Sequence, residues 1–153
     1  MKSKRNKTID ISLADGQGYL TRCISIEQPI SEISPVLNKT VCGNMLSVCP
    51  FLPQNSIDLI IADPPYNLTK AFNGTNFVKM KPSDYENYTR QWLSLVHPLL
   101  KKNGSIYVCC DWETGLTVGR VLGEYFKVRN RITWQREKGR EIEIGRASCR
   151  ERV

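Results

Sequence analysis

The sequence has few of the residues that form metal sites and no run that could cross a membrane. It contains a single histidine, His97, and none of its six cysteines forms a C-x-x-C pair, so no metal site is expected. No run approaches the roughly 18 apolar residues of a membrane span. The start, MKSKRNKTID, lacks the apolar core of a signal peptide. We therefore expect a cytoplasmic protein with reduced thiols and no membrane association.

Acidic residues are fewer than basic ones, 15 against 22, which gives a formal net charge of +7. The excess is spread over the chain, and such a surface favours an acidic partner, most often nucleic acid, because phosphate contacts release counterions. Charge alone does not decide this, since basic solvated surfaces also occur on proteins that never bind DNA. The candidate phosphate contacts, or else solvated side chains of an edge strand, are Arg129, Arg131, Arg136 and Lys138.

The chain divides into three parts by its residue pattern. Residues 1–39 are polar and interrupted by prolines, and we interpret them as an extension with one candidate strand at residues 19–26. Residues 40–140 alternate short apolar runs with helical segments, which is typical of an α/β domain with parallel strands and crossover helices. Residues 141–153, EIEIGRASCRERV, fit no element and resemble the translation of a common sequencing adapter. We predict that they are a non-native tail, with a short disordered native tail as the alternative.

The elements of residues 40–140 follow from apolar runs and helix-end signals. The apolar run at residues 56–62 predicts a central strand that is buried on both faces. Ser83 and Glu86 have capping-box spacing, which predicts the start of a helix there. Pro98 is expected to kink this helix and Gly104 to end it. Further elements are expected as a buried strand at residues 105–110, a helix at residues 113–126 and an edge strand at residues 128–134.

The tetrapeptide Asp63-Pro64-Pro65-Tyr66 directly follows the predicted central strand, and open α/β sheets bind ligands at the carboxyl ends of strands. The prolines hold the residues before them extended, which leaves a rigid row of carbonyl acceptors. The Asp63 carboxylate and Pro64 carbonyl could accept both N–H bonds of an exocyclic amine such as adenine N6. The lone pair of that nitrogen would then point at an electrophilic methyl group. Tyr66 offers a ring on which an extruded base can stack. The alternative is a plain turn.

Five segments between residues 40 and 140 share their pattern with one protein family. They are Gly43-Asn44-Met45-Leu46, NSIDLIIADPPYN, DYENYTRQWL, LLKKNGSIYVCCDWETG and ITWQREKGR. Together they resemble the N6-adenine/N4-cytosine DNA methyltransferases, especially the circularly permuted adenine group of restriction–modification systems. The resemblance implies the amino-terminal, catalytic-motif part of a Rossmann-like methyltransferase domain that uses S-adenosylmethionine. Its partner would be double-stranded DNA with a flipped target base.

The same resemblance implies roles for individual residues. The catalytic residues would be Asp63, Pro64, Pro65 and Tyr66. Aspartate at position 63 favours adenine, because cytosine enzymes usually have serine there. Asp63 would also lie at the cofactor, together with Asn44, where relatives often have aspartate. The glycine-rich F-x-G-x-G cofactor loop and the target-recognition region of the family are not found in this chain, so we expect the fragment alone to be inactive.

Several alternatives stay open at this point. The parent protein could be an N4-cytosine methyltransferase, a methyltransferase acting on RNA, a free base or a protein amide, or a nucleic-acid-binding module with an inert motif. Asp111 and Trp112 could line the same cleft or pack at a strand end. The loop that contains residues 72–77 could be a mobile flap or a plain surface loop. His97 is interpreted as a structural residue. The sequence does not indicate an oligomeric state.

Overall fold

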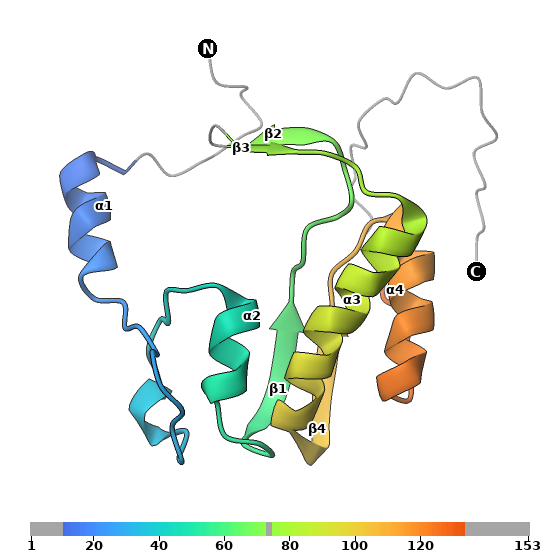
Figure 1. Cartoon of the computed structure of the whole chain (residues 1–153). Coiled ribbons are helices and arrows are strands. Elements are labelled where there is room, and N and C mark those ends of the chain that lie inside the picture. The colour runs from blue at the N-terminus through green and yellow to red at the C-terminus, as the bar shows by residue number, and fades with distance from the viewer. Residues whose placement is uncertain (1–10, 73–74, 134–153) are drawn as a thin grey trace.

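The computed structural model describes residues 11–72 and 75–133 (Figure 1). The α-helices are α1 (Leu13–Leu20), α2 (Met45–Val48), α3 (Pro82–Val96) and α4 (Trp112–Tyr125). The strands are β1 (Ile57–Ala62), β2 (Lys70–Phe72), β3 (Thr75–Phe77) and β4 (Leu100–Val108). Short 3-10 turns are η1 (Ser34–Val36), η2 (Cys49–Phe51) and η3 (His97–Leu99). No described helix is long and apolar enough to cross a membrane. No three described His, Cys, Asp or Glu residues are grouped as metal ligands.

Strands β1 and β4 run parallel, and helix α3 makes the crossover between them. The pairing joins Leu59 to Ser105 and continues in step to Ala62 and Val108. Because the two strands are parallel, their carboxyl ends lie at the same edge of the sheet. The predicted α/β architecture with parallel strands and a crossover helix is therefore confirmed, as are the strand at β1 and the helix over α4. The strand predicted at residues 105–110 is confirmed only in part, because β4 starts at Leu100, ends at Val108 and leaves Tyr107 exposed.

One face of this sheet carries the hydrophobic core. Trp92 and Leu93 of α3 are 1% and 0% exposed, and Val121 of α4 is 0% exposed. They pack with strand residues that include Ile60 and Ile106, whose side chains face the helices. Residues at three- and four-residue steps along α3 supply one apolar stripe, as a helix packed on a sheet requires. The helices α3 and α4 thus cover the same side of the two strands.

The opposite face of the sheet is open among the described residues. Leu59 and Ile61 of β1 are 51% and 70% exposed, and Tyr107 of β4 is 52% exposed. Ile61 and Tyr107 are paired in the ladder, so they lie next to each other on this face. The prediction that β1 is buried on both faces is wrong for this chain, because no described element covers the second face.

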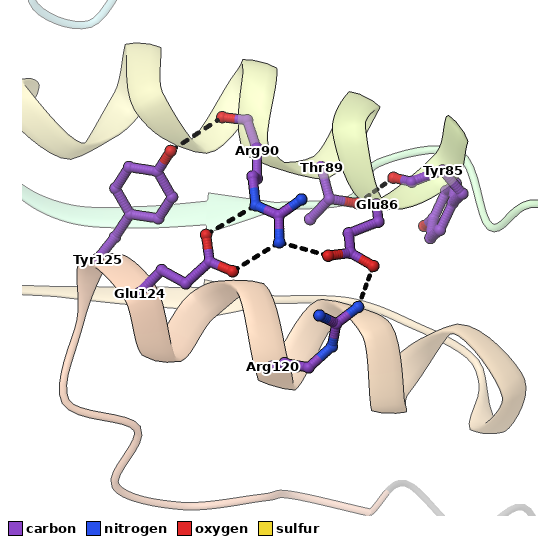
Figure 2. Close-up of polar contacts among 7 residues, drawn as sticks. All are labelled: Tyr85, Glu86, Thr89, Arg90, Arg120, Glu124 and Tyr125. Carbon is purple, nitrogen blue, oxygen red and sulfur yellow. Dashed lines mark hydrogen bonds and ion pairs between the residues drawn. The ribbon is translucent and has the colours of Figure 1, made fainter. Parts of the chain in front are cut away.

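A network of charged side chains joins α3 to α4 (Figure 2). The Arg90 guanidinium donates to both Glu124 oxygens at 2.8 Å and also to Glu86 one turn earlier. Glu86 in turn accepts from Arg120 of α4. The Arg120 and Arg90 guanidinium groups lower the pKa of the Glu86 carboxyl. Ion pairs at a protein surface contribute little stability each, so this network chiefly fixes how the two helices are aligned.

The predicted capping box at the start of α3 is wrong. The helix begins at Pro82, in the first helical position, where a missing N–H costs nothing because that group has no helical partner anyway. The Ser83 hydroxyl donates to Asp84 rather than to the backbone, and Glu86 is bound by arginines. Pro98 does not kink α3 either; the helix ends at Val96 and passes into the 3-10 turn η3.

Two predicted strands are also wrong. Residues 19–26 contain the end of α1 and then a single parallel bridge between Ile24 and Val41. Helix α1 forms there because the Ser12 hydroxyl caps it by accepting from the Asp15 amide at 3.1 Å. Residues 128–133 form no strand, since alternation of side chains does not by itself supply a ladder partner. Trp134 and the proposed tail at residues 141–153 lie outside the described residues.

Gly104 was expected to end a helix, but it lies inside β4 at an irregularity of the ladder. The partner of Ile57 is Leu100, whereas the partner of Leu59 is Ser105, so β4 carries extra residues there. A Cβ atom at position 104 would lie 2.8 Å from Leu100 Cδ2 and 3.1 Å from the Asp58 carbonyl oxygen. Only glycine allows this close approach of the two strands.

We predict that Gly104→Ala lowers the free energy of unfolding by about 1–3 kcal/mol, because backbone atoms must move to admit the methyl group. Gly119→Ala is the matched control: it lies in α4 with nothing within 4 Å of the added Cβ. The control should be neutral or stabilising by up to about 1 kcal/mol, the helix propensity of alanine over glycine. Urea unfolding followed by circular dichroism measures both. Equal stabilities of the two variants would refute the steric explanation.

Candidate active site

The tetrapeptide Asp63-Pro64-Pro65-Tyr66 lies where β1 ends, next to the end of β4. The Cys109 amide donates to the Ala62 carbonyl at 2.8 Å, so the ladder holds the chain up to the residue before Asp63. Asp63 and Pro65 are exposed, while Pro64 and Tyr66 are half-buried. The motif therefore starts from a rigid strand end and faces solvent, as a site for a large substrate requires.

Asp63 and Tyr66 contact each other across the turn. The Tyr66 hydroxyl donates to Asp63 Oδ1 at 2.7 Å. Asp63 Oδ2 has no hydrogen-bond partner among the described residues. The bond to Asp63, followed by burial, raises the pKa of Tyr66 to about 12. The tyrosine thus stays protonated and orients the carboxylate, whose second oxygen can accept a donor from a ligand.

The far end of the motif is tied to α3 and to the loop that precedes it. The Pro65 carbonyl accepts the hydroxyl of Tyr85 at 3.0 Å and the amide of Asn67 at 3.2 Å. The Asn67 side chain in turn accepts from the Met80 amide at 2.7 Å and donates to the Met80 carbonyl at 3.1 Å. Residues 67 and 80 are therefore clasped together just before α3 begins.

The loop between these clasped residues contains a β-hairpin that the sequence did not predict. Strands β2 and β3 pair antiparallel, with Lys70 opposite Phe77. Beyond the hairpin, the Lys79 ammonium pairs with Glu113 in the first turn of α4. Residues 72–77, predicted as a mobile flap or a plain surface loop, belong to this hairpin, and whether it acts as a flap stays a prediction. Residues 73–74 lie outside the described residues.

The loop after β4 contributes different groups to the same edge. Asp111 caps α4: its Oδ1 accepts from the Thr114 amide at 2.7 Å and from the Thr114 hydroxyl. This bond pattern favours the packing interpretation of Asp111 over a direct role. Trp112 is 74% exposed, and the Arg131 guanidinium carbon lies 4.5 Å from the ring centroid. Of the four candidate phosphate contacts, Arg136 and Lys138 lie outside the described residues.

Asn44 lies at a helix start rather than in a visible pocket. Its side-chain oxygen accepts from the Leu46 amide at 2.9 Å and so caps α2, while its amide nitrogen has no partner among the described residues. In Figure 1 the first turn of α2 is level with the carboxyl end of β1. No hydrogen bond joins Asn44 to Asp63 among the described residues.

Sequence reasoning missed Tyr85 and Asn67, the two residues that donate hydrogen bonds to the Pro65 carbonyl of the motif. The sequence patterns assigned no role to either residue. A phenol in a buried position that must find a hydrogen-bond partner was the available signal for Tyr85. His97 is structural as predicted, because it packs against Phe126 and Tyr125 with ring centroids 5.1 Å and 5.8 Å away.

Comparison with known proteins places this strand-and-motif arrangement in one family. A family model described as DNA methylase, of the N6/N4 type, matches residues 57–150, more than half of the chain. The chain belongs to this DNA methylase family. The matched range runs into residues 141–150, whose origin outside the natural protein stays a prediction.

Individual relatives are type II and adenine methyltransferases. The chain is 33% identical over 105 residues to the type II methyltransferase M.HpaI of Haemophilus parainfluenzae, covering 66% of this chain and 32% of that protein. It is 32% identical over 107 residues to the type II methyltransferase M2.MboI of Moraxella bovis, covering 61% and 39%. It is 32% identical over 92 residues to the DNA adenine methyltransferase YhdJ of Escherichia coli (strain K12), covering 60% and 31%. The chain thus spans about a third of the length of these relatives.

The hydrogen bond between Tyr66 and Asp63 predicts a specific titration. With a pKa of about 12 in the folded protein against about 10 when unfolded, the tyrosine contributes stability that is complete below pH 10. This contribution is lost as the pH rises through 12. We expect Asp63→Ala to lower the pKa of Tyr66 toward 10. Tyrosine ring carbon NMR, assigned with Tyr66→Phe, measures it; a wild-type pKa near 10 would contradict the bond.

Proposed function

We propose that the protein containing this chain transfers a methyl group from S-adenosylmethionine to the N6 amino group of adenine in DNA. The carrying observation is the exposed Asp63 carboxylate at the end of β1, oriented by Tyr66 at 2.7 Å with its second oxygen available. Family membership and a relative named as a DNA adenine methyltransferase support the same reaction. The whole protein would be longer than this chain, as its relatives are.

Each residue of the motif would have its own role in binding and orienting the target amine. An aromatic amine is a poor nucleophile because its lone pair is delocalised into the ring. Asp63 Oδ2 and the Pro64 carbonyl would accept its two N–H bonds, which draws the nitrogen toward tetrahedral geometry and concentrates its lone pair. Holding the amine at a fixed orientation supplies further rate acceleration through positioning. The half-buried ring of Tyr66 would lie against the face of the base.

Such a site can act only on a base that has left the duplex, so we propose that the target adenine is flipped out of double-stranded DNA. S-adenosylmethionine supplies the electrophilic methyl group when bound. Asn44 and Asp63 are the described residues that would contact it, through an amide N–H and a carboxylate oxygen. Since the proposed substrate is cellular DNA, we also propose a cytoplasmic location.

Replacement of Asp63 by alanine tests the function. In the protein encoded by the complete gene, Asp63→Ala should reduce transfer of labelled methyl groups to DNA by about 100-fold or more, as loss of one key polar group in other active sites does. DNA affinity, measured by fluorescence anisotropy, should change little. The matched control is Asp58→Ala on the same strand, which removes an exposed ion pair with Lys101 and should leave the rate unchanged.

The outcomes separate the competing classes of protein. A protein that binds DNA but shows no transfer with or without Asp63 would be a binding module. Transfer to RNA in preference to DNA oligomers would assign a different substrate. Equal transfer rates for wild type and Asp63→Ala would show that the carboxylate has no catalytic role.

A further inference from the structure

Tyr85 is the buried residue through which helix α3 contacts the motif. Its side chain is on the second turn of α3 and the residue is 3% exposed. Its hydroxyl donates to the Pro65 carbonyl at 3.0 Å, across 20 residues of sequence. Burial raises the pKa of the Tyr85 phenol. The phenol therefore remains a protonated donor at neutral pH.

Fixing the Pro65 carbonyl fixes the start of Tyr66, whose hydroxyl holds Asp63. Each proline ring holds its own φ near −65°, and a residue that precedes a proline is kept extended. Pro64 is subject to both limits, because it is a proline and is followed by Pro65. Neither proline limits the ψ angle of Pro65, and rotation about it turns the Pro65 carbonyl and the start of Tyr66 together. The bond from Tyr85 holds that carbonyl, and so it holds Tyr66 where its hydroxyl reaches Asp63 Oδ1.

Helix α3 is held in place by hydrogen bonds within the helix and by ion pairs to α4, so it can fix the position of the motif. The Thr89 hydroxyl donates to the Tyr85 carbonyl at 2.7 Å within the helix. The next residue, Arg90, is bound by Glu124 of α4, as Figure 2 shows together with Tyr85 and Thr89. Tyr85 thus connects the motif to the packed pair of helices and not merely to a surface loop.

We propose that Tyr85 is a positioning residue for methyl transfer: by holding the Pro65 carbonyl, its hydroxyl keeps Tyr66 in place to orient the Asp63 carboxylate toward the target amine. The kinetic part of this inference rests on the proposed function. A purely structural tyrosine would stabilise the fold without changing the geometry of the motif. Tyr85→Phe distinguishes the two roles, because it keeps the buried ring and removes only the hydroxyl.

The matched control is Tyr88→Phe. Tyr88 is on the same helix, half-buried, with its ring centroid 6.0 Å from that of Tyr85. Its hydroxyl makes no hydrogen bond with any residue in the described ranges 11–72 and 75–133. In the protein encoded by the complete gene, Tyr85→Phe should lower kcat by about tenfold with KM for DNA nearly unchanged, the loss expected for one misdirected acceptor. Tyr88→Phe should leave both constants at the wild-type values.

A second measurement does not depend on enzymatic activity. The Asn67 amide shares the Pro65 carbonyl with Tyr85, so its hydrogen exchange reports the order of the motif. We expect exchange at Asn67 to be about tenfold faster in Tyr85→Phe than in wild type or Tyr88→Phe. If the wild-type protein transfers no methyl group, the proposed function fails, and this measurement still decides whether Tyr85 orders the motif.

A rescue experiment shows whether Tyr85→Phe acts by removing the hydrogen-bond donor or by damaging the fold. Replacement of Tyr85 by 4-aminophenylalanine puts an N–H donor where the hydroxyl was, and it should restore kcat and the slow exchange at Asn67. The inference is overturned if Tyr85→Phe behaves like Tyr88→Phe in both measurements. It is also overturned if the melting temperature falls while 4-aminophenylalanine restores stability without restoring kcat.

Discussion

The site depends on the parallel pairing of β1 with β4. Parallel strands place their carboxyl ends at the same edge of the sheet. The residues that follow Ala62 and Val108 are therefore brought together, although Ala62 and Val108 are 46 positions apart in the sequence (108 − 62). The crossover through α3 is what makes this pairing possible. Without the ladder, the Asp63 motif would be a proline-rich turn with no fixed neighbour. The loop that begins at Cys109 would then not lie beside the motif.

The helices packed on the sheet also hold the motif in place. The face of the sheet with Ile60 and Ile106 is covered by α3 and α4, and the core closes around Leu93. From this rigid layer, Tyr85 reaches the Pro65 carbonyl, and the clasp between Asn67 and Met80 closes the loop behind the motif. The carboxylate is therefore exposed to solvent while its supporting backbone is held from the buried side. That combination suits a site that must admit a large substrate and still orient one amine.

The sequence predicted the features that depend on local pattern. The strand β1, the helix α3 and the motif that follows β1 were all predicted, because apolar runs and strand-end position leave clear traces in residue order. The pattern failed where a tertiary partner decides the outcome. Ser83 and Glu86 have capping-box spacing, but arginines on two helices bind Glu86 instead. Residues 128–133 alternate like a strand, yet no described strand pairs with them. Tyr85 was hidden for the same reason, since its hydroxyl partner lies 20 residues away.

The most direct test of the proposed reaction is nucleoside mass spectrometry of DNA from a methylation-deficient host that expresses the complete gene. We expect N6-methyladenine to appear, and to be absent when Asp63 is replaced by alanine. Aspartate at the first position of the motif underlies the choice of adenine. The appearance of N4-methylcytosine without N6-methyladenine, or N6-methyladenine that persists without Asp63, would contradict the assignment.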